Sequence, residues 1–126
     1  MAIVNINTYN DVDFYRTYVY QTQEIDTNGT TYNIPFDLTG AMLQMGVRVN
    51  ASDVEEQLLL TSSNGGIIIE DAANGIFTLN ITQSQLLLLP VGSYVHSLIR
   101  IYSYSDRDFR YLIWHGTLTN NAGPSR

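Results

Sequence analysis

The sequence predicts an all-β protein, an antiparallel β-sandwich of the immunoglobulin-like or jelly-roll-like kind with about seven or eight strands. Apolar residues recur at every second position in several short segments, and turns rich in Gly, Asn and Asp separate these segments. Only residues 83–89 show the pattern of a helix longer than a single turn. A single helix of about two turns cannot cover a parallel sheet, which argues against a helical bundle and a parallel α/β fold.

The composition indicates one domain, residues 1–126, because a chain of this length with 44% hydrophobic residues can bury a core of its own. There is no Cys, so disulfides and Cys-based metal sites are excluded. The net charge is −6, and the six basic residues are scattered arginines. We therefore expect no nucleic-acid partner and no contact with an anionic membrane. The sequence shows no membrane span or signal peptide, which predicts synthesis in the cytoplasm.

The N-terminal third predicts an edge segment, a strand and a turn. Residues 1–10 form an N-terminal arm or edge strand, because the apolar segment within them is short. Residues 12–21 alternate over the length of one strand. Asp26 to Gly29 then supply a turn whose Asn-Gly pair tolerates positive φ. Pro35 is confined to the start or the edge of the next strand, because it has no N–H to donate.

The middle of the chain predicts four strands with clear alternation. These are residues 41–49, 57–61, 67–69 and 76–81, which Gly- and Asn-containing turns separate. Because alternate side chains of a strand point to opposite faces, one set of each strand is expected inside the sandwich. That set consists of Ala41, Leu43, Met45, Val47, Val49, Phe77, Leu79 and Ile81.

Two segments break this strand pattern and predict helix. In residues 50–56, Ser52 and a glutamate three residues later fit the capping box of a single helical turn. Thr82 and Gln85 fit the same box at the start of residues 83–89, whose leucines are good helix formers. We expect this short helix to close one end of the sandwich.

The C-terminal part predicts a long hairpin. Residues 93–104 and 109–120 alternate as strands on either side of a turn at Ser105 and Asp106. Residues 121–126 are expected to form an exposed tail. The side chains of the hairpin expected inside are Val95, Ile99, Ile101, Leu112, Trp114 and Leu118.

The same two-residue loop places His96 directly opposite His115 on the neighbouring strand. Two opposed imidazoles could hold a divalent metal, because cross-strand Cβ atoms lie about 5 Å apart. A useful site needs a third or fourth ligand, and no carboxylate lies near either histidine in the sequence. The ordinary interpretation is a half-exposed polar pair, and no metal site is predicted.

No motif in the sequence predicts catalysis. There is no G-x-S-x-G nucleophile turn and no D-x-D-x-D-G calcium loop. Paired carboxylates fall at strand ends or in loops, where solvated acids are the usual state. These pairs are Asp11 and Asp13, Glu55 and Glu56, Glu70 and Asp71, and Asp106 and Asp108. We therefore predict no catalytic residue, no cofactor and a non-enzymatic protein.

The abundance of tyrosine predicts an interaction surface. Nine Tyr stand against four Phe and one Trp, and Tyr-rich sheet faces with few charges are typical of interfaces. Strand edges supply a second kind of contact, because a short arm can add to the sheet of a neighbour. The predicted interface residues are Ile3, Val4 and Ile6 in the arm and Tyr102, Tyr104, Phe109 and Tyr111 in the final hairpin.

A series of short motifs extends from about residue 11 to the C-terminus. They are Asp13 to Arg16, Phe36 to Ala41, Met45 to Arg48, Leu60 to Ser62, Asn64 to Ile67, Asp71 to Gly75, Leu88 to Tyr94 and Trp114 to Thr119. In their order and spacing they resemble a small family of structural proteins of tailed bacteriophages and prophages. The resemblance implies an immunoglobulin-like or BppU-N-terminal-like sandwich associated with the tail or baseplate, and it implies no catalytic residue. The chain departs from it in a polar insertion, Thr22 to Asn33, and in its Tyr-rich last hairpin.

The expected function is therefore that of a virion structural protein, made in the cytoplasm of the bacterial host. It would dock by sheet edges and Tyr-rich faces onto tail, neck or baseplate proteins and onto copies of itself, as a homo-oligomer or in a symmetric assembly. One alternative is a capsid decoration or cement protein. A further alternative is a carbohydrate-binding module for host attachment, which would require an exposed aromatic in a groove, whereas Trp114 is expected in the core.

Overall fold

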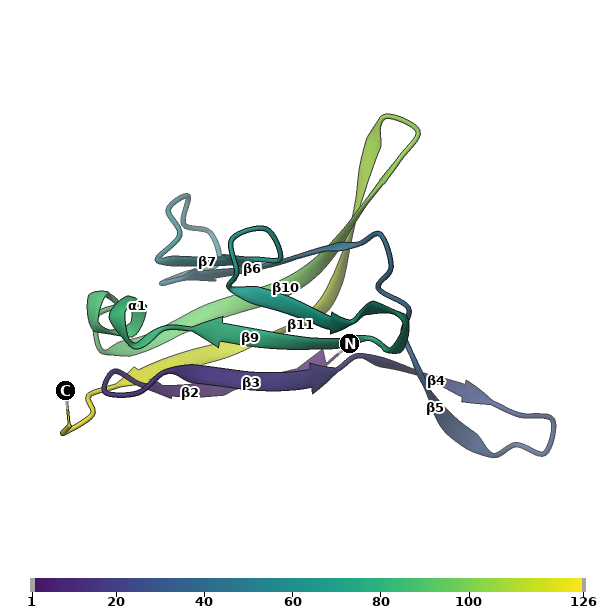
Figure 1. The fold of residues 1–126 in the computed structure, drawn as a ribbon, viewed down its shortest axis with the longest axis horizontal. Helices are drawn as coiled ribbons and strands as arrows, with labels where there is room; N and C mark the ends of the chain where they lie inside the picture. The colour runs from purple at the N-terminus through teal and green to yellow at the C-terminus, as the bar shows by residue number, and fades with distance from the viewer. Residues whose placement is uncertain (1, 126) are drawn as a thin grey trace.

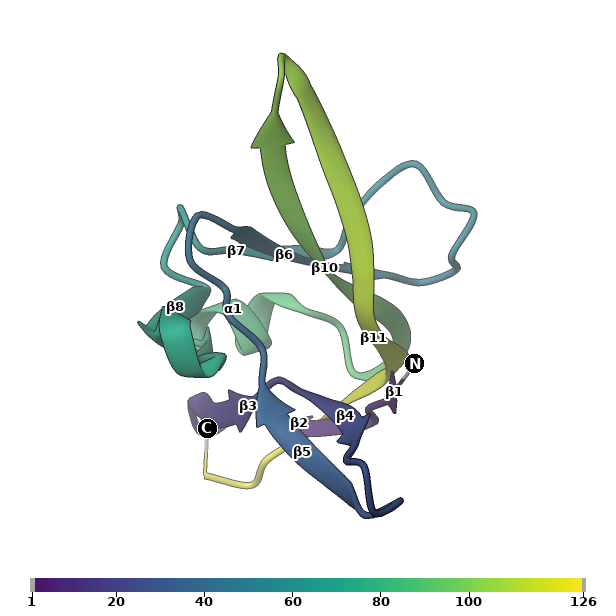
Figure 2. The same ribbon diagram turned by 90° about the vertical axis from the view of Figure 1, so that its right-hand side faces the viewer.

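The computed structural model describes residues 2–125, and over this range the chain forms an all-β sandwich. Two sheets face each other, and two hairpins extend from them in different directions (Figures 1 and 2). The predicted sandwich is confirmed, with eleven strands in the described part of the chain rather than seven or eight. The larger number arises because the arm forms two short strands and the polar insertion forms a hairpin of its own.

The larger sheet has the order β1-β11-β10-β6-β7, and β2 also pairs with β11. All its pairings are antiparallel except those of β1 and β2, which run parallel to β11. Its strands are β1 (Ala2–Ile3), β2 (Ile6–Tyr9), β6 (Met42–Arg48), β7 (Leu58–Thr61), β10 (Gly92–Tyr104) and β11 (Arg107–Asn121).

The smaller sheet has the order β3-β9-β8 and is antiparallel throughout. Its strands are β3 (Phe14–Val19), β8 (Ile67–Asp71) and β9 (Ile76–Ile81), and a 3-10 helix, η1 (Ala72–Asn74), joins the last two. A separate hairpin consists of β4 (Gln21–Ile25) and β5 (Thr31–Pro35).

The predicted strand over residues 12–21 is divided at Tyr20. The backbone N–H of Tyr20 donates to the carbonyl of Gly75, and the carbonyl of Tyr20 accepts from the N–H of Phe36 (2.8 Å and 2.9 Å). These two bonds hold the chain where it leaves the smaller sheet and enters the β4–β5 hairpin. The turn predicted in that hairpin is confirmed, since Gly29 has a φ of 82° and Asp26 caps it.

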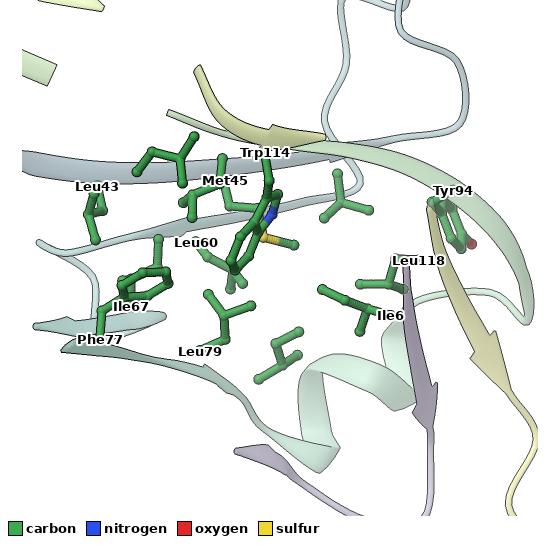
Figure 3. Packing of buried hydrophobic residues seen from close by; sticks show 14 of the residues in the cluster. Ile6, Leu43, Met45, Leu60, Ile67, Phe77, Leu79, Tyr94, Trp114 and Leu118 are labelled. Carbon is green, nitrogen blue, oxygen red and sulfur yellow. The ribbon is translucent and has the colours of Figure 1, made fainter. Parts of the chain in front are cut away.

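The core lies between the two sheets, and alternation placed much of it correctly. Leu43, Met45 and Val47 of β6 are fully buried, whereas Val49 lies beyond the strand and is exposed. Figure 3 shows Leu43, Met45 and Trp114 of the larger sheet facing Ile67, Phe77 and Leu79 of the smaller sheet. The smaller sheet contributes Ile67, Phe77, Leu79 and Ile81, of which the last three were predicted.

The predicted helix is confirmed as α1 (Gln83–Leu88), which lies at one end of the sandwich (Figure 1). Thr82 forms the capping box: its hydroxyl accepts from the N–H of Gln85, and the Gln85 side chain accepts from the N–H of Thr82. The helical turn predicted near Ser52 is wrong. That segment is an irregular loop, held by Arg48, whose guanidinium donates to two loop carbonyls.

The long hairpin has the predicted two-residue loop but not the predicted register throughout. Ser105 and Asp106 have φ values of 53° and 62°, as in a type I′ turn. From the loop back to Ile99, which pairs with Leu112, the register is the predicted one. The next residue, Leu98, pairs with Trp114, so Ile113 has no partner on β10 and forms a β-bulge. The bulge places both Ile113 and Trp114 inside.

The predicted inward set of the hairpin is therefore partly wrong. Ile101, Trp114 and Leu118 are buried as expected, but Val95 and Ile99 are only half-buried and Leu112 is exposed. Both faces of β10 carry apolar residues, so alternation alone did not distinguish them. The side chains that β10 buries instead are Tyr94, His96 and Leu98.

The N-terminal segment, β1 and β2, forms an edge of the larger sheet beside β11. Ile3 pairs with His115 and Ile6 with Leu118, and the chain between them passes close to Gly116. A Cβ at position 116 would collide with the carbonyl oxygen of Val4, which explains the glycine. Ile6 belongs to the core, so its assignment to an interface is wrong. Val4 is half-buried and Ile3 is exposed.

The predicted exposed tail is also partly wrong. Asn121 still belongs to β11, and Gly123 is buried with its N–H donating to the Asn10 side chain at 2.8 Å. The N–H of Ser125 donates to the Asp11 carboxylate. The end of the chain is therefore tied to the loop after β2, and Arg126 lies outside the described residues. No helix within residues 2–125 is long and apolar enough to span a membrane.

Candidate functional site

The distal part of the β10–β11 hairpin leaves the body of the sandwich. Pairing of β10 with β6 ends at Ile101 and Met42, whereas pairing of β10 with β11 continues to Tyr104 and Arg107. Beyond Ile101 the hairpin is thus a two-stranded ribbon with no third strand beside it, and it rises clear of the other elements in both views (Figures 1 and 2).

One side of this ribbon carries an aromatic and basic surface, here called the hairpin face. Cross-strand partners share a side of a sheet, so three consecutive alternate pairs define it. The pairs are Arg100 with Tyr111, Tyr102 with Phe109, and Tyr104 with Arg107. All of these residues except Arg107 line a shallow hollow of about 500 Å³, together with Ser103. The structure therefore brings together all four aromatic residues that the sequence predicted for an interface in this hairpin.

Arg100 lies at the base of the hairpin face, in the pair nearest the sandwich. Its guanidinium carbon lies 4.2 Å from the ring centre of Tyr111, 4.4 Å from that of Phe36 and 5.2 Å from that of Tyr102. These are cation–π distances. The one ion pair of residues 2–125 joins Arg48 and Glu56, so Arg100 is held by rings and not by a carboxylate. Its Nε atom is buried and makes no hydrogen bond.

The four predicted aromatics differ in how far they are engaged. Tyr102 is half-buried and its hydroxyl donates to the carbonyl of Asp37 at 3.2 Å. Phe109 is half-buried under Arg107, whose guanidinium carbon lies 4.5 Å from the ring centre. Tyr104 and Tyr111 are exposed. The last two are therefore available to a partner, and the first two fix the base of the ribbon.

The sequence missed Arg100 and Phe36 as parts of this site. Phe36 follows β5 and is far from the hairpin in the chain, so no local pattern connected it to Arg100. Arg100 lies between Ile99 and Ile101, which were predicted inward, so the sequence placed it on the solvent side and gave no signal of this site. A cation on that side of a strand requires either water or aromatic rings around it.

The structure separates the two histidines that the sequence placed opposite each other. The bulge pairs His96 with Gly116 and Ser97 with His115. No three His, Cys, Asp or Glu side chains gather into a metal-binding group in the described part of the chain. His96 is buried, His115 is exposed, and neither ring nitrogen of His96 has a hydrogen-bond partner.

Burial lowers the pKa of His96 below its ordinary value near 6.5, because a charged imidazole would lose its hydration. Backbone groups of Val4 and Thr117 oppose this pKa shift, and the nearby His115 adds to it. The unfolded chain therefore takes up a proton at His96 at a higher pH than the folded chain does.

We expect the free energy of unfolding to fall as the pH drops below about 6.5, by up to about 1.4 kcal/mol per pH unit, until the folded pKa is reached. Above that range the contribution of neutral His96 is fully present. Urea unfolding of the wild type and of His96→Met at several pH values between 5 and 8 measures the effect. His96→Met should remove this slope and His115→Gln should not; equal slopes in wild type and His96→Met would contradict the assignment.

Most of the paired acids have local structural partners. Asp13 accepts from the N–H of Gln83 at the start of α1, and Glu70 accepts from the Thr78 hydroxyl. Such contacts fix loops and strand ends and do not create a shared proton site. The others are Asp11 with Ser125, Glu56 with Arg48, Asp71 with Asn74 and Asp108 with Ser103.

The geometry of the hairpin face suits binding of another surface: exposed phenol rings around a cation, on a ribbon that reaches away from the domain. No protein-family model matches the chain, and no curated protein matches it either.

Proposed function

We propose that this protein is a non-enzymatic structural component of a tailed-phage virion. It docks through the hairpin face onto tail, neck or baseplate proteins or onto copies of itself. The observation that carries the proposal is the ribbon beyond Ile101, which leaves its own sandwich with Tyr104 and Tyr111 exposed.

The energetics of the ribbon support a docking role. An isolated two-stranded hairpin is only marginally stable in water and gains from a third layer. Tyr and Arg are enriched among the residues that contribute most to protein–protein binding. Arg100, held between the rings of Phe36 and Tyr111, keeps the base of the ribbon rigid, which lowers the entropy lost on binding.

A second projection lies on another side of the molecule. It is the β4–β5 hairpin, which contains the whole polar insertion (Figure 2). Its side chains Ile25 and Tyr32 are exposed. Two projecting hairpins allow one chain to contact two neighbours, as a subunit of a ring larger than a dimer does. Of the predicted arm contacts, Ile3 remains exposed and belongs to this proposal as an edge residue, whereas Ile6 does not.

The double change Tyr104→Asp with Tyr111→Asp is expected to leave the domain folded and to reduce its incorporation into particles at least about tenfold. Both rings are exposed, and an aspartate at position 111 still faces the guanidinium of Arg100. Incorporation is measured by quantitative mass spectrometry of purified virions from a complementation strain.

The matched control is Tyr9→Asp with Val91→Asp, which adds the same charge at two exposed residues outside the hairpin face. The control should be incorporated normally. Normal incorporation of the hairpin variant would exclude the hairpin face as the docking surface. The copy number in the same data separates a tail or baseplate location from capsid decoration, because each follows the symmetry of its own part of the particle.

A further inference from the structure

A groove of about 840 Å³ opens between the end of β3 and the edge of the larger sheet. It is here called the β3 groove. Val19, Tyr20 and Gln21 line one side of it, and Val4, Leu112 and Ile113 line the other. No side chain occupies this groove, so the space between the two sheets is open to solvent along this side.

Two buried polar atoms lie in the floor of the β3 groove without a partner. Trp114 is only 5% exposed and its Nε1 makes no hydrogen bond, and the hydroxyl of Tyr18 beside it is also unsatisfied. The two rings meet edge to face, with 4.8 Å between their centres. Leaving such groups unpaired costs about 1–3 kcal/mol each, so the packing beneath the groove is not fully satisfied.

The strand beside the groove has a free backbone edge. Just after β3, the N–H of Tyr20 donates to the carbonyl of Gly75. Backbone bonds of an antiparallel pair alternate along each strand, so in the same register Arg16 and Tyr18 also bond to β9. The backbone groups of Tyr15, Thr17 and Val19 therefore point away from β9. No strand within residues 2–125 pairs with that outer edge.

The lining of the β3 groove carries no charge. Its walls are mainly aliphatic and aromatic, and amide and hydroxyl side chains stand at its mouth: Gln21, Thr22, Gln23 and Asn33. The chain as a whole has a net charge of −6, so the groove differs from the rest of the molecule in having no charged residue in its lining. A charged occupant would lose its hydration there without gaining an ion-pair partner.

We propose that the β3 groove receives an uncharged, extended segment of a partner protein, which adds as a further strand to the free edge of β3. Its alternate apolar side chains enter between Val19 and Leu112. The inference deepens the proposed function and rests on it in one respect, that the partner is another virion chain.

Other occupants fit the groove less well. A sugar would need an accessible ring face to stack on, and Trp114 is too buried to offer one. The projecting hairpins of a second copy carry charges in their distal parts, Glu24 and Asp26 in one, Asp106 to Asp108 in the other. These charges do not match an uncharged groove.

The test places a photo-cross-linking amino acid at position 19 or position 12 in phage-infected cells. Val19 lies in the groove and is 52% exposed, and Val12 lies outside it and is 53% exposed. Cross-linked peptides are identified by mass spectrometry of whole-cell extracts. The expected result is a cross-link from position 19, and not from position 12, to a segment of another chain that contains no charged residue.

A synthetic peptide of the cross-linked segment is then titrated into the purified protein, with Trp114, the only tryptophan, as the fluorescent reporter. Leu112→Glu should weaken binding at least about tenfold, because it places a charge in the groove. Leu59→Glu is the matched control, since Leu59 is 37% exposed on β7 and Leu112 is 40% exposed. This control should bind like the wild type.

Several outcomes would overturn the inference: no cross-link from position 19, equal cross-linking from position 12, or a cross-link to a charged segment, to a glycan or to a second copy. Particle content is scored separately in the same cells. A chain that is present in virions without the expected cross-link removes the groove inference and leaves the proposed function. A chain absent from virions that still forms the cross-link removes the proposed function and leaves the strand-addition site.

Discussion

Replacing Phe77 by alanine is expected to lower the free energy of unfolding by about 3–5 kcal/mol. Phe77 is fully buried on β9, and its ring centre lies 5.7 Å from that of Trp114 on the opposite sheet and 5.9 Å from that of Tyr18. The ring thus joins the two layers of the sandwich. Because domains of this size are stable by only about 5–15 kcal/mol, the variant would keep a small margin.

Urea unfolding followed by far-UV circular dichroism measures this loss. Tyr15→Ala is the control, because Tyr15 is an exposed aromatic on the neighbouring strand β3, and it should change stability by no more than about 0.5 kcal/mol. A loss below about 1 kcal/mol for Phe77→Ala would show that this ring does not hold the two sheets together.

Replacing Asn120 by alanine is expected to cost about 3–4 kcal/mol, although the residue is polar. Asn120 is fully buried, and its amide donates to the carbonyls of Leu86 and Leu89 at 3.0 Å and 2.9 Å. Its carbonyl oxygen accepts from the hydroxyl of Thr8 at 2.9 Å. One side chain therefore connects α1, β11 and β2. Its removal leaves the two carbonyls without this donor and leaves the Thr8 hydroxyl with only a 3.5 Å bond to the carbonyl of Thr119.

A double-mutant cycle with Thr8→Val tests the mechanism. Removing both partners of the hydroxyl bond leaves fewer unpaired groups, so the double variant should lose less stability than the sum of the single variants. Asn7→Ala, at an exposed neighbour on β2, is the control and should be nearly neutral. Strict additivity, or a small loss for Asn120→Ala, would contradict the proposed role.

Elements set by local interactions were predicted well. The strand β6 follows from alternation, since its inward residues lie two apart, and the helix α1 follows from the Thr82 capping box. The two-residue loop at Ser105 and Asp106 was also placed correctly. In each case the determining residues are neighbours in the chain, so one short segment contains the whole signal.

Contacts between distant segments were not predicted. Because of the bulge at Ile113, His96 pairs with Gly116 and not with His115. The N-terminal segment pairs in parallel with β11, so Ile6 lies in the core and not on a surface. The parts of the hairpin face that depend on Phe36 were missed for the same reason. Burial of Asn120 likewise depends on a helix that is distant in sequence.

The sequence by itself determined the fold class, the clearest strands, the helix cap and the turn of the last hairpin, because side-chain alternation and capping act within a few residues. The tertiary structure alone decided the bulged register, the placement of the arm, the rings around Arg100 and the open groove beside β3. These features depend on how the two layers fit against each other, and that fit is a property of the packed chain, not of any one segment.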